Sequence, residues 1–287
     1  MSVKHPVISV TGSSGAGTST AKIALEHLFR REKVTPAIVE GDCFHKYDRM
    51  EFRAKAKEYE AAGKRLSHFS DDANLFGRIG DLFKNYGEKG VGQARTYVHD
   101  DEEAQLYGVD AGKFTDWRDV GEGSDLLFYE GLHGAVEEAR SHVDLSMGIV
   151  PVVNLEWVQK IHRDTAMRGY SSEAVVENIL SRMHDYVHFI TPQFTYTDIN
   201  FQRVPLVDTS NPFIARDVPT PDESLVVIRI RKPEQWGIDF PWLTSMLKDS
   251  FMSRRNTIVV PAGKMMLAME MILAPILHEL LEKERKA

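Results

Sequence analysis

Short apolar runs alternate with helix-like segments along most of the chain. Residues 7–10 form a β-branched run, followed by a glycine-rich turn and an apolar stripe at helical spacing over residues 21–29. Further strands are predicted at 37–39, 126–129 and 148–153, each as a nearly continuous apolar run. Such runs are typical of strands covered on both faces, as in a parallel sheet. The alternation of strands and helices predicts an α/β protein.

The predicted helices follow the same periodic signal. Apolar residues recur at three- and four-residue intervals where a helix has one buried face. We expect helices over about 50–65, 75–83, 155–168 and 172–189, and a terminal helix from Lys264 onward with a kink at Pro275.

The segment 224–232 differs from the continuous apolar runs of the other predicted strands, because its residues alternate between the two faces of a strand. Val226, Ile228 and Ile230 face one way, and Arg229 and Arg231 the other. We interpret it as an antiparallel edge strand, and 257–260 as a further strand. With no linker rich in Pro, Gly or Ser, residues 1–287 are predicted to form a single domain. Its sheet would be mixed, mostly parallel and flanked by helices.

Composition and net charge limit the kinds of partner that the protein is expected to bind. The 287 residues are 43% hydrophobic and 27% charged, as in ordinary globular proteins, and the formal net charge is −7. An acidic chain lacks the electrostatics of a general nucleic-acid binder, although a local basic cluster can still bind phosphate. Cys43 is the only cysteine, and no apolar window is long enough to span a bilayer. We therefore expect a cytoplasmic protein that binds neither nucleic acid nor membrane.

The turn after the first strand has the spacing of a P-loop, G-x-x-x-x-G-K-[ST], with Thr18 where Lys is usual. Its glycines let backbone N–H groups converge on a phosphate, and the following helix adds the positive end of its dipole. Ser19 is placed to reach a nucleotide-bound Mg²⁺. The alternative is an ordinary tight βα turn. The predicted ATP-binding residues are Gly12, Ser13, Ser14, Gly15, Ala16, Gly17, Thr18, Ser19 and Thr20.

Two acids follow predicted strands, where ligands bind in an open α/β sheet. Asp42 comes after the second strand and could accept a proton from an attacking hydroxyl. A helix cap or turn is an equally good interpretation of this residue. Glu130 ends the apolar run LLFY, as in a Walker B strand, and is a candidate for holding Mg²⁺.

A basic helix offers replacement charge for the missing lysine. Lys160, Asp164 and Arg168 are spaced i, i+4, i+8 and share one face, with Arg163 as a further cation. Taken alone, a solvated face with weak ion pairs would be the better interpretation. Beside a lysine-free P-loop, we expect these cations to act on transferring phosphate.

A second phosphate site is indicated downstream of Asp42. His45 and Arg49 could bind an acceptor phosphate, and the polar stretch 95–100, with Tyr97 and His99, is a further candidate. Cys43 is interpreted as a small buried filler. Arg229 and Arg231 either discourage edge pairing or belong to an effector or subunit interface.

Six segments in chain order resemble the phosphoribulokinase family, in particular its bacterial branch. They are the lysine-free loop at 12–20, EGDCFH at 40–45, YEGLHG at 129–134, KIHRD with RGYSSE within 160–173, NFQR at 200–203, and DTSNPF at 208–213. The resemblance covers essentially the whole chain.

The resemblance implies a nucleoside monophosphate kinase-like fold and a defined reaction. The family uses MgATP to phosphorylate the 1-hydroxyl of ribulose 5-phosphate, which gives the CO₂ acceptor of the Calvin cycle. It implies Asp42 as base, Asp164 as second essential acid and Glu130 as the Walker B acid, which we expect to hold the metal together with Ser19. Lys160, Arg163 and Arg168 would lie near the phosphates, and His45 and Arg49 at the sugar phosphate. We also expect Arg163, Tyr97 and His99 to bind the sugar phosphate.

The bacterial branch also implies control and assembly: activation by NADH, inhibition by AMP, and a homo-octamer or other homo-oligomer. A related uridine or pantothenate kinase is the nearest alternative, although such enzymes usually keep the P-loop lysine. A GTPase switch is disfavoured because the chain has no Asn-Lys-x-Asp motif.

Overall fold

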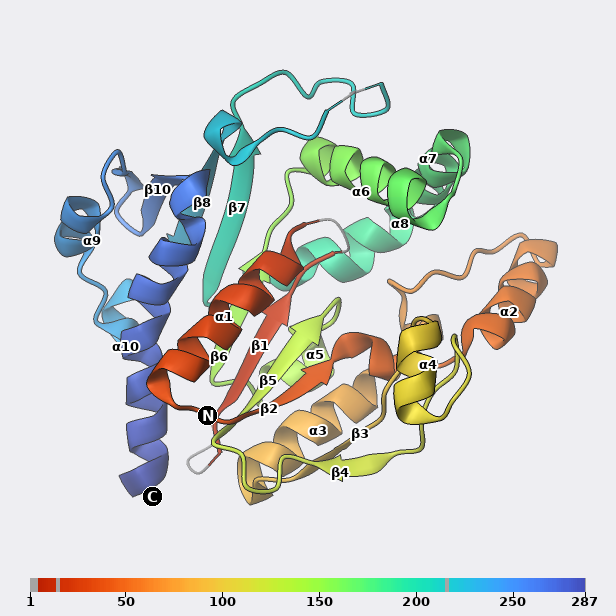
Figure 1. Cartoon of the computed structure of the whole chain (residues 1–287), viewed down its shortest axis with the longest axis horizontal. Coiled ribbons are helices and arrows are strands. Elements are labelled where there is room, and N and C mark those ends of the chain that lie inside the picture. The colour runs from red at the N-terminus through yellow and green to blue at the C-terminus, as the bar shows by residue number, and fades with distance from the viewer. Residues whose placement is uncertain (1–4, 14–15, 215–216, 287) are drawn as a thin grey trace.

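The computed structural model describes residues 5–13, 16–214 and 217–286, and its centre is one eight-stranded sheet (Figure 1). The strand order is β2-β5-β1-β6-β7-β8-β10-β9. The first five run parallel, and each of the last three is antiparallel to its neighbour. In that order they are Pro36–Glu40, Leu126–Gly131, Val7–Thr11, Leu145–Ile149, Ile199–Pro205, Ser224–Ile230, Thr257–Pro261 and Phe251–Arg254. A small separate sheet pairs β3 (Gly92–Ala94) with β4 (Arg118–Val120).

Helices cover both faces of this sheet. The pair α1 (Thr18–Glu32) and α10 (Met265–Lys286) packs on one face, and α3 (Phe76–Lys89) with α5 (Glu137–Arg140) packs on the other. The remaining helices lie around the rim of the sheet. They are α2 (Arg49–Ala61), α4 (Asp101–Tyr107), α6 (Val153–Arg168), α7 (Ser172–Ser181), α8 (Met183–Asp185) and α9 (Phe240–Met246). This confirms the predicted mixed, mostly parallel sheet flanked by helices.

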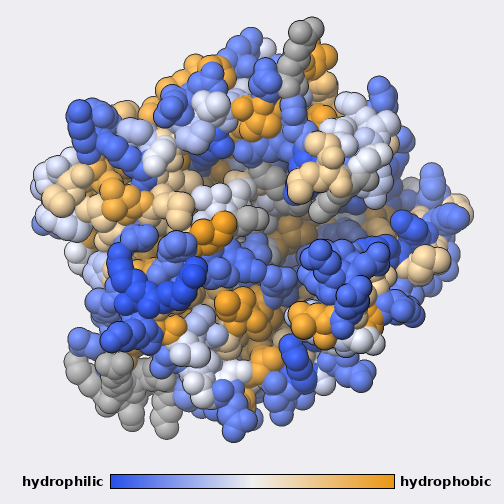
Figure 2. Space-filling model, in the orientation of Figure 1, coloured by the Kyte–Doolittle hydropathy of each residue, from blue (hydrophilic) through white to orange (hydrophobic). Residues whose placement is uncertain are grey.

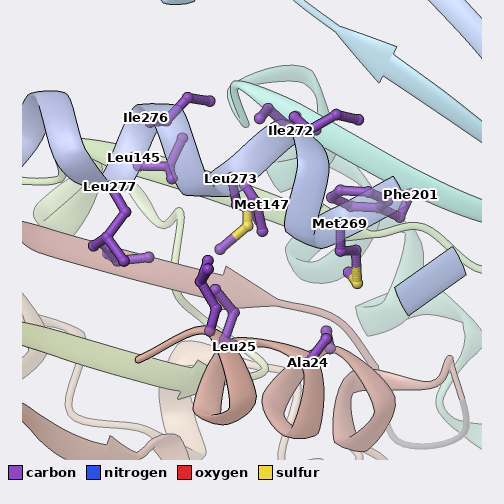
Figure 3. Close-up of a cluster of buried hydrophobic side chains, with 14 of the residues drawn as sticks. Ala24, Leu25, Leu145, Met147, Phe201, Met269, Ile272, Leu273, Ile276 and Leu277 are labelled. Carbon is purple, nitrogen blue, oxygen red and sulfur yellow. The ribbon is translucent and has the colours of Figure 1, made fainter. Parts of the chain in front are cut away.

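The apolar strands feed two separate cores because successive side chains point to opposite faces. Phe128 of β5 joins the core under α1 and α10, while its neighbours Leu127 and Tyr129 join the core under α3. Figure 3 shows the first core, where Leu25 of α1 lies near Leu273 of α10. Burying each such side chain contributes about 1.5–3 kcal/mol, so the centre of the sheet is firmly held.

Three predicted elements differ from the structure. The strand predicted at 148–153 is wrong: β6 is Leu145–Ile149, and α6 begins at Val153. Pro151 has no N–H for a ladder, which ends the strand early. The segment β8 is antiparallel as predicted but is not an edge, since β7 and β10 flank it. The proposed role of Arg229 and Arg231 in guarding an edge therefore falls.

The third difference concerns the long helix predicted over 172–189. It is divided into α7, α8 and a π-helical turn at Tyr186–Ile190. At the C-terminus, α10 continues through Pro275. No helix in the described part of the chain is long and apolar enough to cross a membrane. That residues 1–287 form a single domain stays a prediction.

Candidate active site

The phosphate loop leaves the centre of the sheet between β1 and α1. Gly12 N–H donates to Gly131 O at 3.1 Å, which ties the start of the loop to the end of β5. Gly17 has a φ of 101°, a left-handed conformation that strains other residues, so glycine is required there. Within the predicted set, Ser14 and Gly15 lie outside the described residues, and so does the side chain of Ser19.

Thr18, in the position usual for lysine, hydrogen-bonds Glu130 at the end of β5. Burial raises the pKa of Glu130, and this hydrogen bond partly opposes the rise. Glu40 of β2 is the register partner of Glu130, so two carboxylates lie side by side at the strand ends. Lys22 hydrogen-bonds Glu40 from one turn further along α1. Sequence analysis missed Lys22, whose spacing after Thr18 was the available signal.

Asp42 lies in the one-turn helix Gly41–Phe44 after β2, with β5 between β2 and β1. Its carboxylate oxygens lie 3.6 Å from Nε2 of His45 and 3.8 Å from Nε2 of His99. The Asp42 side chain keeps 42% exposure, so a substrate hydroxyl can reach it.

Arg95 holds the helical turn at Gly41–Phe44 in place through hydrogen bonds to backbone carbonyl groups. Its Nε donates to Cys43 O at 2.9 Å and its Nη2 to His45 O at 2.6 Å, while its guanidinium stacks on Phe114 at 3.6 Å. Burial raises the pKa of the Cys43 thiol to about 12, as expected of a buried filler. The stretch containing Arg95 was singled out by sequence, but its supporting role depends on contacts that spacing does not reveal.

Three largely buried histidines, His45, His68 and His133, lie behind Asp42, and we call them the histidine wall. The His45 ring lies 4.3 Å from that of His68, and His68 stacks on Phe52 at 3.9 Å. Burial lowers the pKa of His45, and it lowers the pKa of His68 to about 2 and that of His133 to about 3. These rings are therefore uncharged at neutral pH, where they donate or accept hydrogen bonds but carry no positive charge.

The predicted sugar-phosphate residues meet here, with one exception. Arg49 Nη2 donates to His99 O at 2.7 Å, and Tyr97 lies edge-on to His99 with ring centres 4.9 Å apart. Tyr97 also faces His45 at 6.4 Å. Arg163, the exception, binds Asp164 on α6.

The basic face of α6 is internally paired. Lys160 Nζ donates to Asp164 Oδ2 at 2.7 Å, and Arg163 Nη2 donates to Oδ1 at 2.9 Å. Burial opposes ionisation of Asp164, but the hydrogen bonds and charges of Lys160 and Arg163 outweigh it and lower its pKa. Burial in turn lowers the pKa of Lys160. The Arg168 side chain lies outside the described part of the chain.

Arg182 links the two sides of the site and was missed by sequence analysis. It follows α7, and its positive charge acts on Asp164 and Lys160 as well as on His45 and His68. Figure 2 shows the surface hollowed between the part formed by α6 and α7 and the part formed by α2 and α4. Polar residues such as Ser181 and His184 surround Arg182 in the sequence, so no local pattern singled it out.

The sheet is mostly parallel, a glycine loop precedes its first helix, an acid ends the neighbouring strand, and α6 carries cations. Together these features define a P-loop kinase. The chain belongs to the phosphoribulokinase / uridine kinase family, which it matches over residues 7–210.

Similar proteins cover the full length of the chain. It is 57% identical over 292 residues to "Phosphoribulokinase 1" of Cereibacter sphaeroides, with 100% of both chains covered. It is 56% identical over 289 residues to "Phosphoribulokinase" of Nitrobacter vulgaris, with 99% of both covered. The solved phosphoribulokinase from Rhodobacter spheroides superimposes with a TM-score of 0.89 at 54% identity, covering 99% of this chain and 100% of that one.

Proposed function

We propose that this protein transfers the γ-phosphoryl group of MgATP to the 1-hydroxyl of ribulose 5-phosphate. The products are ADP and ribulose 1,5-bisphosphate, the acceptor for CO₂ in the Calvin cycle. The observation that carries this proposal is the full-length identity of 52–57% to proteins named phosphoribulokinase, together with an accessible Asp42 beside phosphate-binding candidates.

Asp42 acts as the general base. Its carboxylate takes the proton of the sugar hydroxyl as that oxygen attacks the γ-phosphorus and the bond to ADP breaks. Burial lowers the pKa of His45, so that its ring is uncharged beside Asp42 at neutral pH. No lysine or arginine among the described residues forms an ion pair with Asp42, which leaves lone pairs available. Arg49 and Tyr97 hold the phosphate of the sugar so that its far hydroxyl meets Asp42.

Lys160 and Arg168 supply positive charge to the transferring phosphoryl group in place of the P-loop lysine. Lys160 is half-buried and held by Asp164, so its ammonium is oriented before substrate binds. Arg163 supports the same arrangement from the other oxygen of Asp164.

The residues at the end of β5 fit a magnesium ion that arrives with the nucleotide. The described residues contain no group of three or more acids, histidines or cysteines suited to a metal. A nucleotide-bound Mg²⁺ keeps waters and phosphate oxygens as ligands and takes only one or two from the protein. Glu130 would hold it together with Ser19. When bound, Mg²⁺ neutralises charge on the β- and γ-phosphates.

The test is ADP release with ribulose 5-phosphate as acceptor, compared with uridine, followed by phosphorus NMR of the product. We expect ADP release that depends on ribulose 5-phosphate and a new phosphate ester at C1. Faster turnover with uridine would favour the related nucleoside kinase instead.

We further propose that the protein is a homo-oligomer, for example an octamer, activated by NADH and inhibited by AMP, and that Arg229 and Arg231 lie at an effector or subunit interface. Within the chain, Arg231 Nη2 binds Asp198 Oδ1 at 2.7 Å and Arg229 Nη2 binds Phe194 O at 3.3 Å. Replacing both arginines with Ala should blunt NADH activation or change the size measured by light scattering, with basal turnover kept.

A further inference from the structure

Glu156 is a buried carboxylate whose two oxygens are held by hydroxyl groups from two distant segments. Ser13 Oγ donates to Oε1, and Tyr186 OH donates to Oε2 at 2.8 Å. The exposed fractions of Glu156, Ser13 and Tyr186 are 5%, 0% and 5%. Burying a carboxyl group is unfavourable unless its hydrogen bonds offset the lost hydration. We call these three residues the Glu156 clamp.

One end of the clamp lies in the phosphate loop. Ser13 is the second residue of that loop, and its carbonyl accepts a hydrogen bond from Ala16 N–H at 3.0 Å. Ser13 directly follows Gly12, which is itself bound to Gly131. A hydrogen bond on the Ser13 side chain therefore fixes the part of the loop whose backbone N–H groups are expected to face the nucleotide phosphates.

The middle of the clamp lies on the cation-bearing helix. Glu156 is in the first turn of α6, and Lys160 and Asp164 follow at i+4 and i+8 on the same face. Because a helix is rigid over two turns, fastening position 156 to the phosphate loop also sets where the Lys160 ammonium lies relative to bound phosphates. The charge of Lys160 acts on Glu156.

The other end of the clamp, Tyr186, is connected to the histidine wall behind Asp42. Tyr186 begins the π-helical turn, a feature frequent at functional sites, and its ring packs edge-on against Phe69 at 5.9 Å. Its neighbour Asp185 accepts a hydrogen bond from Ser67 Oγ at 2.6 Å. Residues 67–69 include His68, whose ring lies 4.3 Å from that of His45. The clamp is thus part of a continuous chain of contacts between the nucleotide side and the acceptor side.

We propose that Glu156 is a positioning residue. It fixes the position of the phosphate loop relative to the cations of α6 and to the histidine wall behind Asp42. The inference rests on the proposed kinase function. Its first readout, however, is equilibrium binding of a non-hydrolysable MgATP analogue, which does not require the acceptor to be identified correctly.

The test compares Tyr186→Phe, Ser13→Ala and Glu156→Gln with the wild-type protein. Tyr186→Phe keeps the ring against Phe69 and removes only the hydroxyl. The matched control is Tyr86→Phe, a fully buried tyrosine whose OH lies 2.7 Å from Ser124 Oγ under the opposite face of the sheet. We expect each clamp variant to raise the dissociation constant of the analogue and the KM for ATP about tenfold, and the control to leave both unchanged.

Coupling distinguishes positioning from general stability. Because Ser13 and Tyr186 act through the same carboxylate, the double variant Ser13→Ala/Tyr186→Phe should bind nucleotide no more than about twofold worse than either single variant. A purely structural role predicts that the clamp variants, like the control, unfold at lower urea concentration but bind nucleotide as tightly as the wild type. That result overturns the proposal. Independent effects that multiply in the double variant also overturn it. Binding that is intact without turnover on ribulose 5-phosphate in the wild type would instead contradict the proposed function.

Discussion

On α6, Lys160 and Arg163 both bind Asp164 at 2.7 and 2.9 Å, whereas after β2 Asp42 faces two imidazole rings at 3.6 and 3.8 Å. The first carboxylate is surrounded by permanent cations that lower its pKa. The second lies beside His45, whose own pKa burial lowers.

The difference separates two roles that residue type alone does not. A carboxylate whose oxygens are both bound by cations is suited to orienting them and is a poor proton acceptor. A carboxylate that is open to solvent and has no lysine or arginine bound to it keeps lone pairs for a substrate proton. This supports Asp42 rather than Asp164 as the base.

The largest effect is expected for Asp42→Asn, which keeps the shape and removes the proton acceptor. We expect kcat to fall by at least about 10³-fold, because general-base action alone accounts for about 10²–10⁴ and loss of positioning adds to it. Nucleotide binding, measured by calorimetry, should change little. Normal turnover with weakened ATP binding would move the base to another carboxylate, Asp164 first.

On the α6 side, Lys160→Gln should lower kcat about 10²-fold, because an arginine or lysine on the transferring phosphoryl group stabilises charge in the transition state. Lys55→Gln is the matched control, since Lys55 pairs with Glu58 at 2.7 Å on an exposed helix. Such a pair contributes little. Steady-state kinetics showing equal, small effects for both variants would make the Lys160 pair an ordinary ion pair.

The histidine wall makes folding sensitive to acid. His68 stays neutral in the folded protein down to a pKa of about 2, whereas in the unfolded chain it gains a proton below about 6.5. Stability is therefore lost as pH falls from about 6.5, by about 2 kcal/mol for His68 between pH 7 and pH 5. His68→Phe keeps the stack with Phe52 and cannot be protonated.

Urea unfolding at pH 7 and pH 5 checks this expectation. The difference in unfolding free energy between the two pH values should be about 2 kcal/mol smaller for His68→Phe than for the wild type. An equal loss in both proteins would show that His68 is protonated in the folded state.

At the end of β5, Glu130→Gln should raise the Mg²⁺ concentration needed for half-maximal turnover about tenfold and reduce maximal turnover, with the fold intact. Turnover titrated with Mg²⁺ at fixed ATP measures both quantities. Wild-type turnover at limiting Mg²⁺ would remove Glu130 from the metal site.

The sequence predicts this fold well where one local signal specifies each element. The glycine loop at 12–17, the apolar run of β5 and the acid that ends it needed only spacing and residue type. Two strand assignments failed for different reasons. The alternation in β8 does not reveal which strands pair with it, and β7 and β10 flank it in the sheet. The apolar run at 148–153 continues past Pro151, but β6 ends at Ile149.

The site was predicted only as far as its residues lie in recognisable motifs. Asp42, Glu130 and Lys160 were singled out in this way, and their roles stay predictions. Arg182 and Glu156 were not, because each becomes informative only when burial and distant partners are known. For Glu156 the available signal was an acid between the apolar residues Leu155 and Trp157, whereas Arg182 had no such signal.

In the proposed function, the residues around Asp42 bind the phosphate of the acceptor, whereas the cations of α6 stabilise the transferred phosphoryl group. The most direct measurement is the ratio of kcat/KM for ribulose 5-phosphate to that for ribulose, in the wild type and in Arg49→Ala. We predict that the variant reduces this ratio at least about tenfold, through loss of a charge-assisted phosphate contact, with the KM for ATP unchanged. An unchanged ratio, or a rise in the KM for ATP instead, would contradict the account.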